Sequence, residues 1–346
     1  MQQIHFIDPV KHQGWNDMIQ RIEGAGFFHT SCWAEVLKKT YGYRPVYVIS
    51  EEDGHVKALM PLMEVRSLLT GSKGVSLPFT DICDLLCAGK DIFDRVVSFV
   101  KEYGKERKWK YIEWRGGDSF FGDAGSCAEF FGHTLDLTRS EQEIFASFRE
   151  SNRRNINKAA RDGVKAAIDN SMCGIGIYYR LHCNTRRMHG LPPQPFSFFK
   201  KIQELVINQG NGITMLAWSG STPVAGAIFF HFAGKAVYKY GASERIYQHL
   251  RPNNLLMWEA VRYYSEKGLK SLDFGRTETE NQGLLQFKRG WGTTENTIRY
   301  FRYDLRKEAF AGNMKSRLHG RHNAIFRHTP IPLLKLAGSI LYRHIG

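Results

Sequence analysis

The chain has 346 residues, 42% of them hydrophobic and 13% aromatic, which is enough for two packed domains and excludes a disordered protein. Its 48 Lys and Arg against 34 Asp and Glu give a net charge of +14, which favours nucleic acid, phosphate-bearing substrates or an acidic membrane surface as partners. Apolar runs far shorter than a membrane span and a start without a secretory pattern predict a cytoplasmic protein.

The first third of the chain alternates helical and extended patterns. We expect a short helix over 31–42, a hairpin over 44–66, an amphipathic helix over 91–108 and a strand over 109–116. Ser31 is the predicted N-cap of the first helix, and Gly42 is its stop signal. This order predicts an α/β layered first domain over residues 1–135.

A second domain is predicted over residues 136–310, as helices packed on a mostly antiparallel sheet. The predicted helices span 140–164, 177–190, 196–210 and 251–268, and the strands span 213–219, 223–232, 235–243 and 271–275. Ser140 and Glu143 form a capping box at the start of the first of these helices. Six scattered cysteines without a second metal-type pair favour buried thiols over disulfides or a zinc site.

A basic helical tail is predicted over residues 311–346. Residues 306–346 hold eight Lys or Arg against one acid, so they supply +7 of the net charge. An imperfect apolar face accompanies the charge, formed by Ile331, Leu334, Leu336, Ile340, Leu341 and Ile345. Two interpretations fit: a segment that contacts the inner membrane face, or a terminal helix docked on the first domain.

The predicted helix over 140–164 carries a basic stripe at i, i+4, i+7 and i+11 spacing, formed by Arg154, Lys158, Arg161 and Lys165. A solvated helix face explains most such stripes. In this segment only two acids, Glu150 and Asp162, offset six cations: Arg149, Arg153, Arg154, Lys158, Arg161 and Lys165. This imbalance favours a helix face directed at an anion more strongly than in most basic helices.

Two further stretches fit either a site or ordinary structure. Pro252, Asn253 and Asn254 begin a helix, whose first N–H groups either bind an anion or simply start the helix. Asp81 and Asp84 lie among apolar residues, where burial raises a carboxyl pKa toward that of a base, but both also suit turn-capping roles.

The stretch Leu284–Gly292, "LLQFKRGWG", places two cations between two rings. Phe287 can stack on a ring or a nucleobase while Lys288 meets a phosphate, a pairing typical of nucleic-acid end recognition. The alternative is a core phenylalanine beside a surface lysine.

The segments "PNNLLMWEA", "DFGR" and "FKRGWG", with "FRESNRRNINKAARDGV" upstream, resemble the Fem-type aminoacyltransferases. They resemble more closely the Fem-like relatives found with bacterial exopolysaccharide and exosortase systems. The resemblance covers the chain from about Phe27 to Leu305. It implies an α/β fold, α+β layered, of two tandem GNAT-like N-acyltransferase domains with the substrate cleft between them.

The resemblance also implies a reaction, in which an amine of a peptidoglycan or exopolysaccharide precursor attacks an activated acyl carbonyl. Phe287 and Lys288 match the pair beside the acyl-bearing end of the donor, where the cation stabilises developing charge. Acidic and basic acceptor positions fall on Asp81 or Asp84, Lys38 or Lys39, and Arg186 or Arg187. Arg276, Asn253, Asn254 and Trp291 complete the predicted substrate-binding residues.

The donor is a co-substrate, either aminoacyl-tRNA or acyl-CoA, and no bound cofactor or metal is expected. The segment "YQHLRPN" lacks the glycines of the loop by which ordinary GNAT enzymes hold the CoA pyrophosphate, and residues 140–210 leave no room for the coiled-coil arm of some Fem enzymes. The acceptor is expected to be nucleotide- or lipid-linked. The alternative function is a non-catalytic GNAT scaffold that binds anions or a membrane surface in a polysaccharide assembly system.

Overall fold

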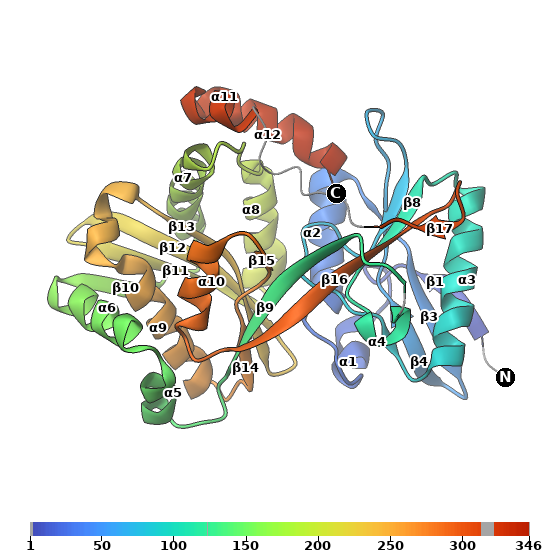
Figure 1. The fold of residues 1–346 in the computed structure, drawn as a ribbon, viewed down its shortest axis with the longest axis horizontal. Coiled ribbons are helices and arrows are strands. Elements are labelled where there is room, and N and C mark those ends of the chain that lie inside the picture. The colour runs from blue at the N-terminus through green and yellow to red at the C-terminus, as the bar shows by residue number, and fades with distance from the viewer. Residues whose placement is uncertain (1–2, 123, 313–321, 346) are drawn as a thin grey trace. The chain divides into compact units, whose positions relative to one another are not determined.

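The computed structural model describes residues 3–122, 124–312 and 322–345, which form two compact units (Figure 1). Unit 1 comprises the described residues within 1–130, 297–317 and 340–346, and unit 2 comprises those within 131–296 and 318–339. The chain leaves unit 1 within strand β9 (Ala128–Asp136) and returns within β16 (Thr294–Asp304). Along the sequence, unit 2 is therefore inserted into unit 1.

Unit 1 combines helices with two small sheets. Its helices are α1 (Trp15–Gln20), η1 (Phe27–His29), α2 (Ser31–Tyr41), α3 (Lys90–Glu106) and α4 (Asp118–Phe121). One sheet has the antiparallel order β1-β3-β4-β7, from Gln3–Ile7, Tyr47–Glu52, His55–Met60 and Leu86–Cys87. The second has the order β2-β5-β6-β8-β16-β17, from Arg44–Pro45, Met63–Val65, Lys73–Val75, Tyr111–Arg115, the end of β16 and Ala309–Phe310. The hairpin predicted over 44–66 is confirmed, since β3 and β4 pair around a turn at Asp53 and Gly54.

Helix α3 covers the core of unit 1 with one apolar face. Phe93, Val96, Val97 and Val100 are buried at the i, i+3, i+4 and i+7 spacing that the sequence indicates. They join Trp109, Ile112 and Trp114 in one cluster. Each fully buried side chain of this kind contributes roughly 1.5–3 kcal/mol relative to exposure, so this face holds the helix on the sheet.

Helix α2 begins differently from the prediction. Ser31 is not its N-cap: the capping residue is Thr30, which makes no side-chain cap hydrogen bond. Instead the backbone N–H of Ser31 donates to Asn16 Oδ1 at 3.0 Å, so a residue of α1 satisfies the first turn. The predicted stop at Gly42 is confirmed, because its φ of 74° lies in the left-handed region that favours glycine.

Unit 2 is built on one larger sheet. Its strands follow the order β10-β11-β12-β13-β14-β9, from Val164–Ile168, Gly212–Ser219, Thr222–Phe232, Lys235–Ser243, Ser271–Asp273 and the end of β9. The short β15 (Thr277–Glu278) pairs with β9. The antiparallel pairing of the three central strands is confirmed, and β13 and β14 are parallel.

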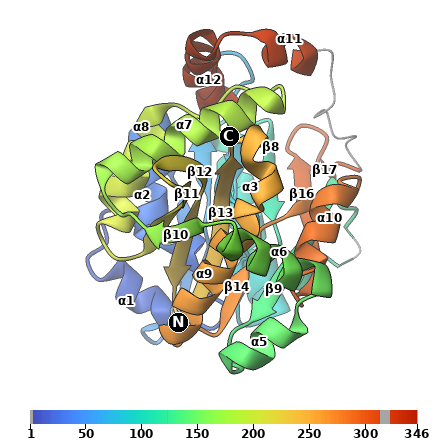
Figure 2. The same ribbon diagram turned by 90° about the vertical axis from the view of Figure 1, so that its left-hand side faces the viewer.

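Helices cover both faces of this sheet. They are α5 (Glu141–Ser147), α6 (Glu150–Arg161), α7 (Met172–Met188), α8 (Phe196–Ile202), the π-helical η2 (Gln203–Ile207), η3 (Arg245–Leu250), α9 (Pro252–Glu266) and α10 (Gln282–Arg289). Ile213 and Met215 share a buried cluster with α9, whereas Leu216 points to the other face, toward α7. Figure 2 shows α7 and α8 on one side of the strands and α6 and α9 on the other.

The helix predicted over 140–164 is interrupted. The capping box of Ser140 and Glu143 is confirmed, but α5 ends at Ser147 because Phe148 is extended and packs on Trp258 and Trp291. The prediction of the basic stripe is therefore wrong at its C-terminal end, because Lys165 lies on β10 rather than on α6. On α6 itself, the stripe cations Arg154 and Lys158 form ion pairs with Glu150 and Asp162.

The C-terminal segment forms helices α11 (His322–His328) and α12 (Ile331–Ile345). The residues of the imperfect apolar face predicted for this segment are not all buried together. Leu334 is fully buried and Gly338 lies against the Pro193 carbonyl, whereas Leu336 and Ile340 are 59% and 52% exposed. Among the described helices, none is both long enough and apolar enough to cross a lipid bilayer.

A buried histidine of α7 predicts a loss of stability in acid. His182 donates from Nε2 to Gln194 Oε1 at 2.8 Å, and burial, with a smaller effect of Arg186, lowers its pKa to about 3. In the unfolded chain a histidine titrates near ~6.5. As the pH falls from about 6.5 toward 3, the unfolded state binds a proton that the folded state refuses, so stability falls by up to ~1.4 kcal/mol per pH unit.

Urea unfolding at pH 7, 5.5 and 4.5 measures this effect. We expect the pH dependence to be shallower in His182→Gln than in the wild type, while His249→Gln, at an exposed position, keeps the wild-type slope. Equal slopes for His182→Gln and the wild type would contradict the assignment.

Candidate functional site

Lys288 is a buried cation near the end of helix α10. Its side chain is inside unit 2, with the residue only 2% exposed, and Nζ donates to the carbonyls of Gly275 at 2.7 Å and Arg276 at 3.1 Å. These carbonyls follow β14, where Gly275 has a φ of 69°. The interpretation of Lys288 as a surface lysine is therefore wrong. An ammonium fixed on two carbonyls is a positive charge preorganised by the fold.

The two rings of the segment Leu284–Gly292 face the core of unit 2. Trp291 is fully buried and makes edge contacts with Phe148, at 4.9 Å between ring centroids, and with Phe287, at 5.8 Å. Phe287 is half-buried at the margin of this cluster. In this conformation Trp291 is a core residue, and Phe287 is the ring beside Lys288 that is still partly exposed.

The glycines around Trp291 allow close packing of α10 against the α5–α6 corner. A Cβ on Gly290 would lie 2.8 Å from Asn152 Nδ2, and one on Gly292, at a φ of 64°, would lie 2.5 Å from Ser147 Oγ. The carbonyl of Gly290 also accepts from the backbone N–H of Arg149 at 2.9 Å. The sequence Gly-Trp-Gly thus brings the residues after Lys288 against the break in the helical segment.

A histidine that the sequence did not single out lies near Lys288. His133 on β9 is fully buried, and its Nε2 donates to Glu295 Oε2 at 2.9 Å. Glu295 is also held by both nitrogens of the Arg289 fork, at 2.6 and 2.9 Å. Burial, and next the charge of Lys288, lower the pKa of His133, so its imidazole is neutral at pH 7. No spacing rule identifies His133, because its partners lie more than 150 residues away.

Of the remaining predicted residues of unit 2, Asn253 lies at the end of β13. The side chain of Asn253 donates to Ser243 Oγ at 3.2 Å, and Thr185 of α7 exchanges two hydrogen bonds with the backbone of Ser243. Arg186 and Arg187 are the next two residues of α7. Arg186 donates from Nε to the Pro192 carbonyl at 3.3 Å.

Asn254 is part of a buried amide pair rather than of the surface. Its Nδ2 donates to Asn152 Oδ1 at 3.5 Å, and both residues are buried. Arg276 contributes its carbonyl to Lys288. Thus Lys288, Phe287 and Arg276 form one constellation, and the start of α9 with the end of α7 forms another.

In unit 1, the side chain of the predicted Asp84 binds a backbone N–H group, and the predicted Asp81 contributes its backbone carbonyl. Asp84 Oδ1 accepts from the N–H of Gly117 at 2.9 Å, and its carbonyl accepts from His29 Nε2 at the same distance. The carbonyl of Asp81 accepts from Tyr300 Oη at 2.6 Å. The Asp84 contact fits the turn-stabilising alternative. The Asp81 contact involves only the backbone, so the role of its carboxylate stays a prediction.

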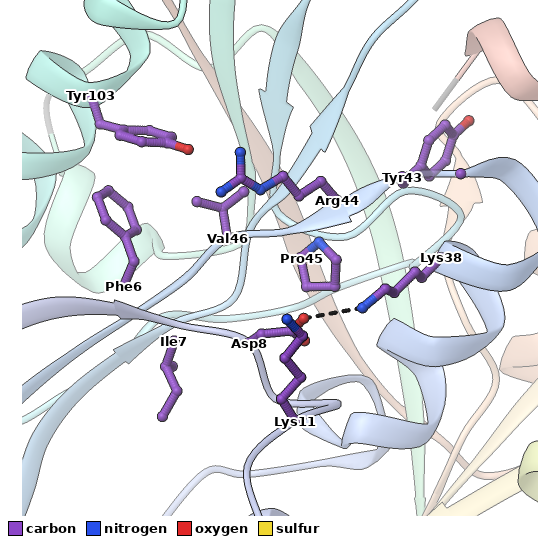
Figure 3. Close-up of a pocket in the computed structure, with 11 residues that line it drawn as sticks. Phe6, Ile7, Asp8, Lys11, Lys38, Tyr43, Arg44, Pro45, Val46 and Tyr103 are labelled. Carbon is purple, nitrogen blue, oxygen red and sulfur yellow. Dashed lines mark hydrogen bonds and ion pairs between the residues drawn. The ribbon is translucent and has the colours of Figure 1, made fainter.

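Lys38 lines a cavity of about 490 Å³ in unit 1, whereas Lys39 does not (Figure 3). The cavity is lined by three cations, one carboxylate and two rings among others: Lys11, Lys38, Arg44, Asp8, Phe6 and Tyr103. Lys38 donates to Asp8 Oδ2 at 3.1 Å. Lys39 instead pairs with Glu35 on the surface of α2, at 2.7 Å. The excess of cations suits an anionic group.

The described residues contain no cluster of three or more His, Cys, Asp or Glu side chains that could hold a metal ion. Lys288 offers a fixed positive charge, because its ammonium is held by two carbonyls. The cavity of unit 1 offers cations that suit an anion.

The family model of the acetyltransferase (GNAT) domain matches residues 146–289. Over 76 residues the chain is 37% identical to a Lipid II:glycine glycyltransferase of Staphylococcus haemolyticus (strain JCSC1435) and 33% identical to one of Staphylococcus aureus. Each match covers 20% of this chain and 18% of the relative, so the chain spans under a fifth of the length of these curated relatives.

Several solved structures superimpose on most of this chain. FemX superimposes with a TM-score of 0.69 at 16% identity, covering 86% of this chain and 96% of FemX. A tandem GNAT protein from the clavulanic acid biosynthesis pathway gives 0.58 at 9% identity, covering 88% and 99%. The C-terminal domain of a putative lysylphosphatidylglycerol synthetase from Agrobacterium fabrum gives 0.57 at 13%, covering 95% and 96%.

At these identities the structures establish the fold. The resemblance to Fem-type proteins is confirmed, whereas the closer resemblance to relatives of exopolysaccharide and exosortase systems stays a prediction. The protein has the fold of FemX and of a tandem GNAT protein, and its residues 146–289 match the family model of the acetyltransferase (GNAT) domain.

Proposed function

We propose that this protein is an acyltransferase that moves an activated aminoacyl group onto an amine of a peptidoglycan or exopolysaccharide precursor. The observation that carries the proposal is the buried ammonium of Lys288, held by two carbonyls inside the matched GNAT domain. The short similarity to glycyltransferases that act on lipid II supports the choice of acceptor.

In the proposed reaction, the acceptor amine attacks the carbonyl carbon of the donor ester. A C–N bond forms, the C–O bond to the carrier breaks, and the proton lost by the amine passes to the leaving hydroxyl. The carbonyl oxygen becomes an oxyanion on the way, and a fixed cation stabilises it without reorganising. Phe287 is proposed to pack beside the end of the carrier.

The segment before α9 favours an aminoacyl ester over acyl-CoA as donor. Residues 245–250 form the helix η3, and the N–H groups of Tyr247, Arg251 and Asn254 already donate to backbone carbonyls. Glycines are also absent from "YQHLRPN", so this segment lacks the open, N–H-rich loop that cradles a pyrophosphate.

A transfer assay with the purified protein tests the function. A lipid-linked or nucleotide-linked peptidoglycan precursor is incubated with aminoacyl-tRNA in one arm and with acetyl-CoA in the other, and the products are analysed by mass spectrometry. We expect the mass of one aminoacyl group on the acceptor in the first arm. Product in neither arm contradicts the enzyme and leaves the non-catalytic scaffold as the function, while product only with acetyl-CoA overturns the donor.

The cavity of unit 1 predicts which of two adjacent lysines handles the acceptor. Lys38→Met should raise the KM for the acceptor by roughly five- to tenfold with little change in kcat, because it removes one cation from a site proposed to bind its phosphates. Lys39→Met is the matched control on the same helix and should change KM less than twofold. Equal effects of both substitutions, measured in steady-state kinetics, would exclude the cavity as an acceptor site.

The other predicted residues remain proposals. We propose that Arg186, Arg187, Asn253 and Arg276 contact the acceptor or the carrier. We propose that Asp81, Asp84, Asn254 and Trp291 act indirectly, by holding neighbouring residues in position. We place the reaction in the cytoplasm, where nucleotide-linked precursors are available.

A further inference from the structure

Two leucines at the tip of a hairpin in unit 1 have no packing role. Leu68 is 102% exposed and Leu69 is 70% exposed, in the turn between β5 and β6. The strands on either side are buried, so the turn extends from a firm base. In Figure 1 this light-blue hairpin stands away from the other strands of its sheet. A contiguous exposed apolar patch is typical of an interaction site, whereas a single exposed leucine is not.

The end of α12 lies beside this turn. His344 contacts it twice: its Nδ1 lies 3.0 Å from Ser67 Oγ, and its carbonyl accepts from Thr70 Oγ1 at 3.2 Å. The same end of the helix exposes Ile340 at 52% and Ile345 at 57%. The four exposed side chains Leu68, Leu69, Ile340 and Ile345 therefore belong to one part of unit 1, which we name the leucine tip.

The C-terminal end of α12 is held in place by buried contacts of Tyr342. Tyr342 is buried, its carbonyl accepts from Tyr43 Oη at 2.9 Å, and its ring contacts Phe79 at 5.7 Å. The opposite side of the same turn of helix is thus used for packing. What remains exposed is a fixed apolar surface rather than a fraying terminus.

The rim of the leucine tip is basic. Arg66 and Lys110 flank the turn, with Lys110 Nζ donating to the Thr70 carbonyl at 2.7 Å, and Arg343 lies beside Ile345. The nearest acid is Glu64, whose buried side chain pairs with Arg66 at 2.8 Å and also with Arg44 and Arg107, so cations outnumber it. No Asp or Glu occurs in residues 65–75 or 329–346. Apolar side chains that project among cations complement a surface that is apolar inside and anionic outside.

We propose that the leucine tip docks on an anionic phospholipid bilayer, with Leu68 and Leu69 inserted among the acyl chains and the rim cations at the lipid phosphates. An apolar tip surrounded by a surplus of cations matches a bilayer whose interior is apolar and whose surface carries lipid phosphates, and the surplus positive charge selects anionic lipid. The proposal concerns the location of the protein and is independent of the acyl-transfer reaction.

Co-sedimentation of the full chain with lipid vesicles tests it. Vesicles of phosphatidylcholine alone are compared with equimolar phosphatidylcholine and phosphatidylglycerol. We expect the wild type to bind the anionic vesicles and to release them as salt increases. The double substitution Leu68→Ser and Leu69→Ser should weaken this binding at least about fivefold. Because both positions are exposed, thermal unfolding should be unchanged.

The matched control is Ile246→Ser in unit 2, where an isoleucine is 73% exposed on η3 and Glu244 lies beside Arg245, so that the surrounding charge is mixed. It should bind anionic vesicles like the wild type. Arg343→Gln should weaken binding by a few-fold through the rim. Point substitutions are preferable to deletion of the tail, because deletion would also uncover Tyr43 and Phe79.

Three results would overturn the proposal: wild type that binds neither vesicle, equal binding by the double variant and the wild type, or a double variant that instead loses self-association in size-exclusion chromatography. Turnover on a soluble nucleotide-linked acceptor is measured in parallel. Lost vesicle binding with retained turnover supports the leucine tip, and absent turnover in the wild type counts against the proposed enzyme alone.

Discussion

Lys288→Met should lower kcat for acyl transfer by about 10²- to 10³-fold, the effect of removing one preorganised oxyanion-stabilising group. Methionine keeps the length of the side chain and its apolar stem but removes the ammonium. Because the wild-type ammonium is already fixed on the carbonyls of Gly275 and Arg276, its charge is available without side-chain ordering in the transition state. Steady-state kinetics with saturating donor measures the loss.

A structural role for Lys288 predicts a different result. Removing the ammonium leaves two buried carbonyls short of a donor, at a cost of roughly 1–3 kcal/mol of stability. Urea unfolding of Lys288→Met therefore accompanies the kinetics, at a temperature where the variant is fully folded. A stability loss with kcat within threefold of wild type would show that Lys288 only positions the turn after β14.

Arg289→Met is the control cation on the same helix. Arg289 is 40% exposed and binds Glu295, so its loss should change kcat less than about threefold. If Arg289→Met lowers kcat as strongly as Lys288→Met does, the effect belongs to the shared polar cluster with His133 and Glu295, and the specific role of Lys288 is refuted.

Trp291→Ala should destabilise unit 2 by roughly 3–5 kcal/mol, the cost typical of truncating a buried tryptophan. The indole is fully buried and packs against Phe148, Phe274 and Phe287, and little of the resulting cavity can collapse because Gly290 and Gly292 already lie in close contact with their neighbours. Chemical unfolding monitored by circular dichroism measures the change.

The matched substitution is Trp291→Phe. The indole Nε1 of Trp291 is buried without a hydrogen-bond partner, so phenylalanine removes volume but no hydrogen bond. Its cost should be clearly smaller than that of alanine, on the order of 1–2 kcal/mol. A Trp291→Ala protein that is as stable as the wild type but fails to bind donor would contradict this structural role and indicate that Trp291 contacts the substrate.

The sequence identified many of the elements because local patterns specify them. Helix α3 follows the 3.6-residue spacing of its apolar residues, and the strands β11, β12 and β13 follow turn residues and apolar runs. The capping box at Ser140 needs only the side chain of Glu143, three residues away. Such features depend on contacts within one or two turns of the chain, and these are readable from the order of residues.

The sequence failed where a distant contact overrides a local preference. Residues 140–164 have a continuous helical pattern. In the structure, however, Phe148 packs on Trp258 and Trp291, and the carbonyl of Gly290 accepts a hydrogen bond from the N–H of Arg149. These contacts end one helix and start another, which places Lys165 on a strand. The prediction of Ser31 as an N-cap was wrong for the same reason, because the distant residue Asn16 accepts the hydrogen bond of the Ser31 N–H.

The sequence by itself determined the alternation of helices and strands, the surplus of positive charge, and the motif that resembles Fem-type proteins. Only the tertiary structure decided that Lys288 is buried on two carbonyls, that Trp291 is core, that His133 lies near Lys288, and that Lys38 rather than Lys39 lines a cavity. Spacing along the chain fixes which face of a helix a side chain occupies. What that face meets depends on residues brought together by folding, and so does the energetic role of each charge.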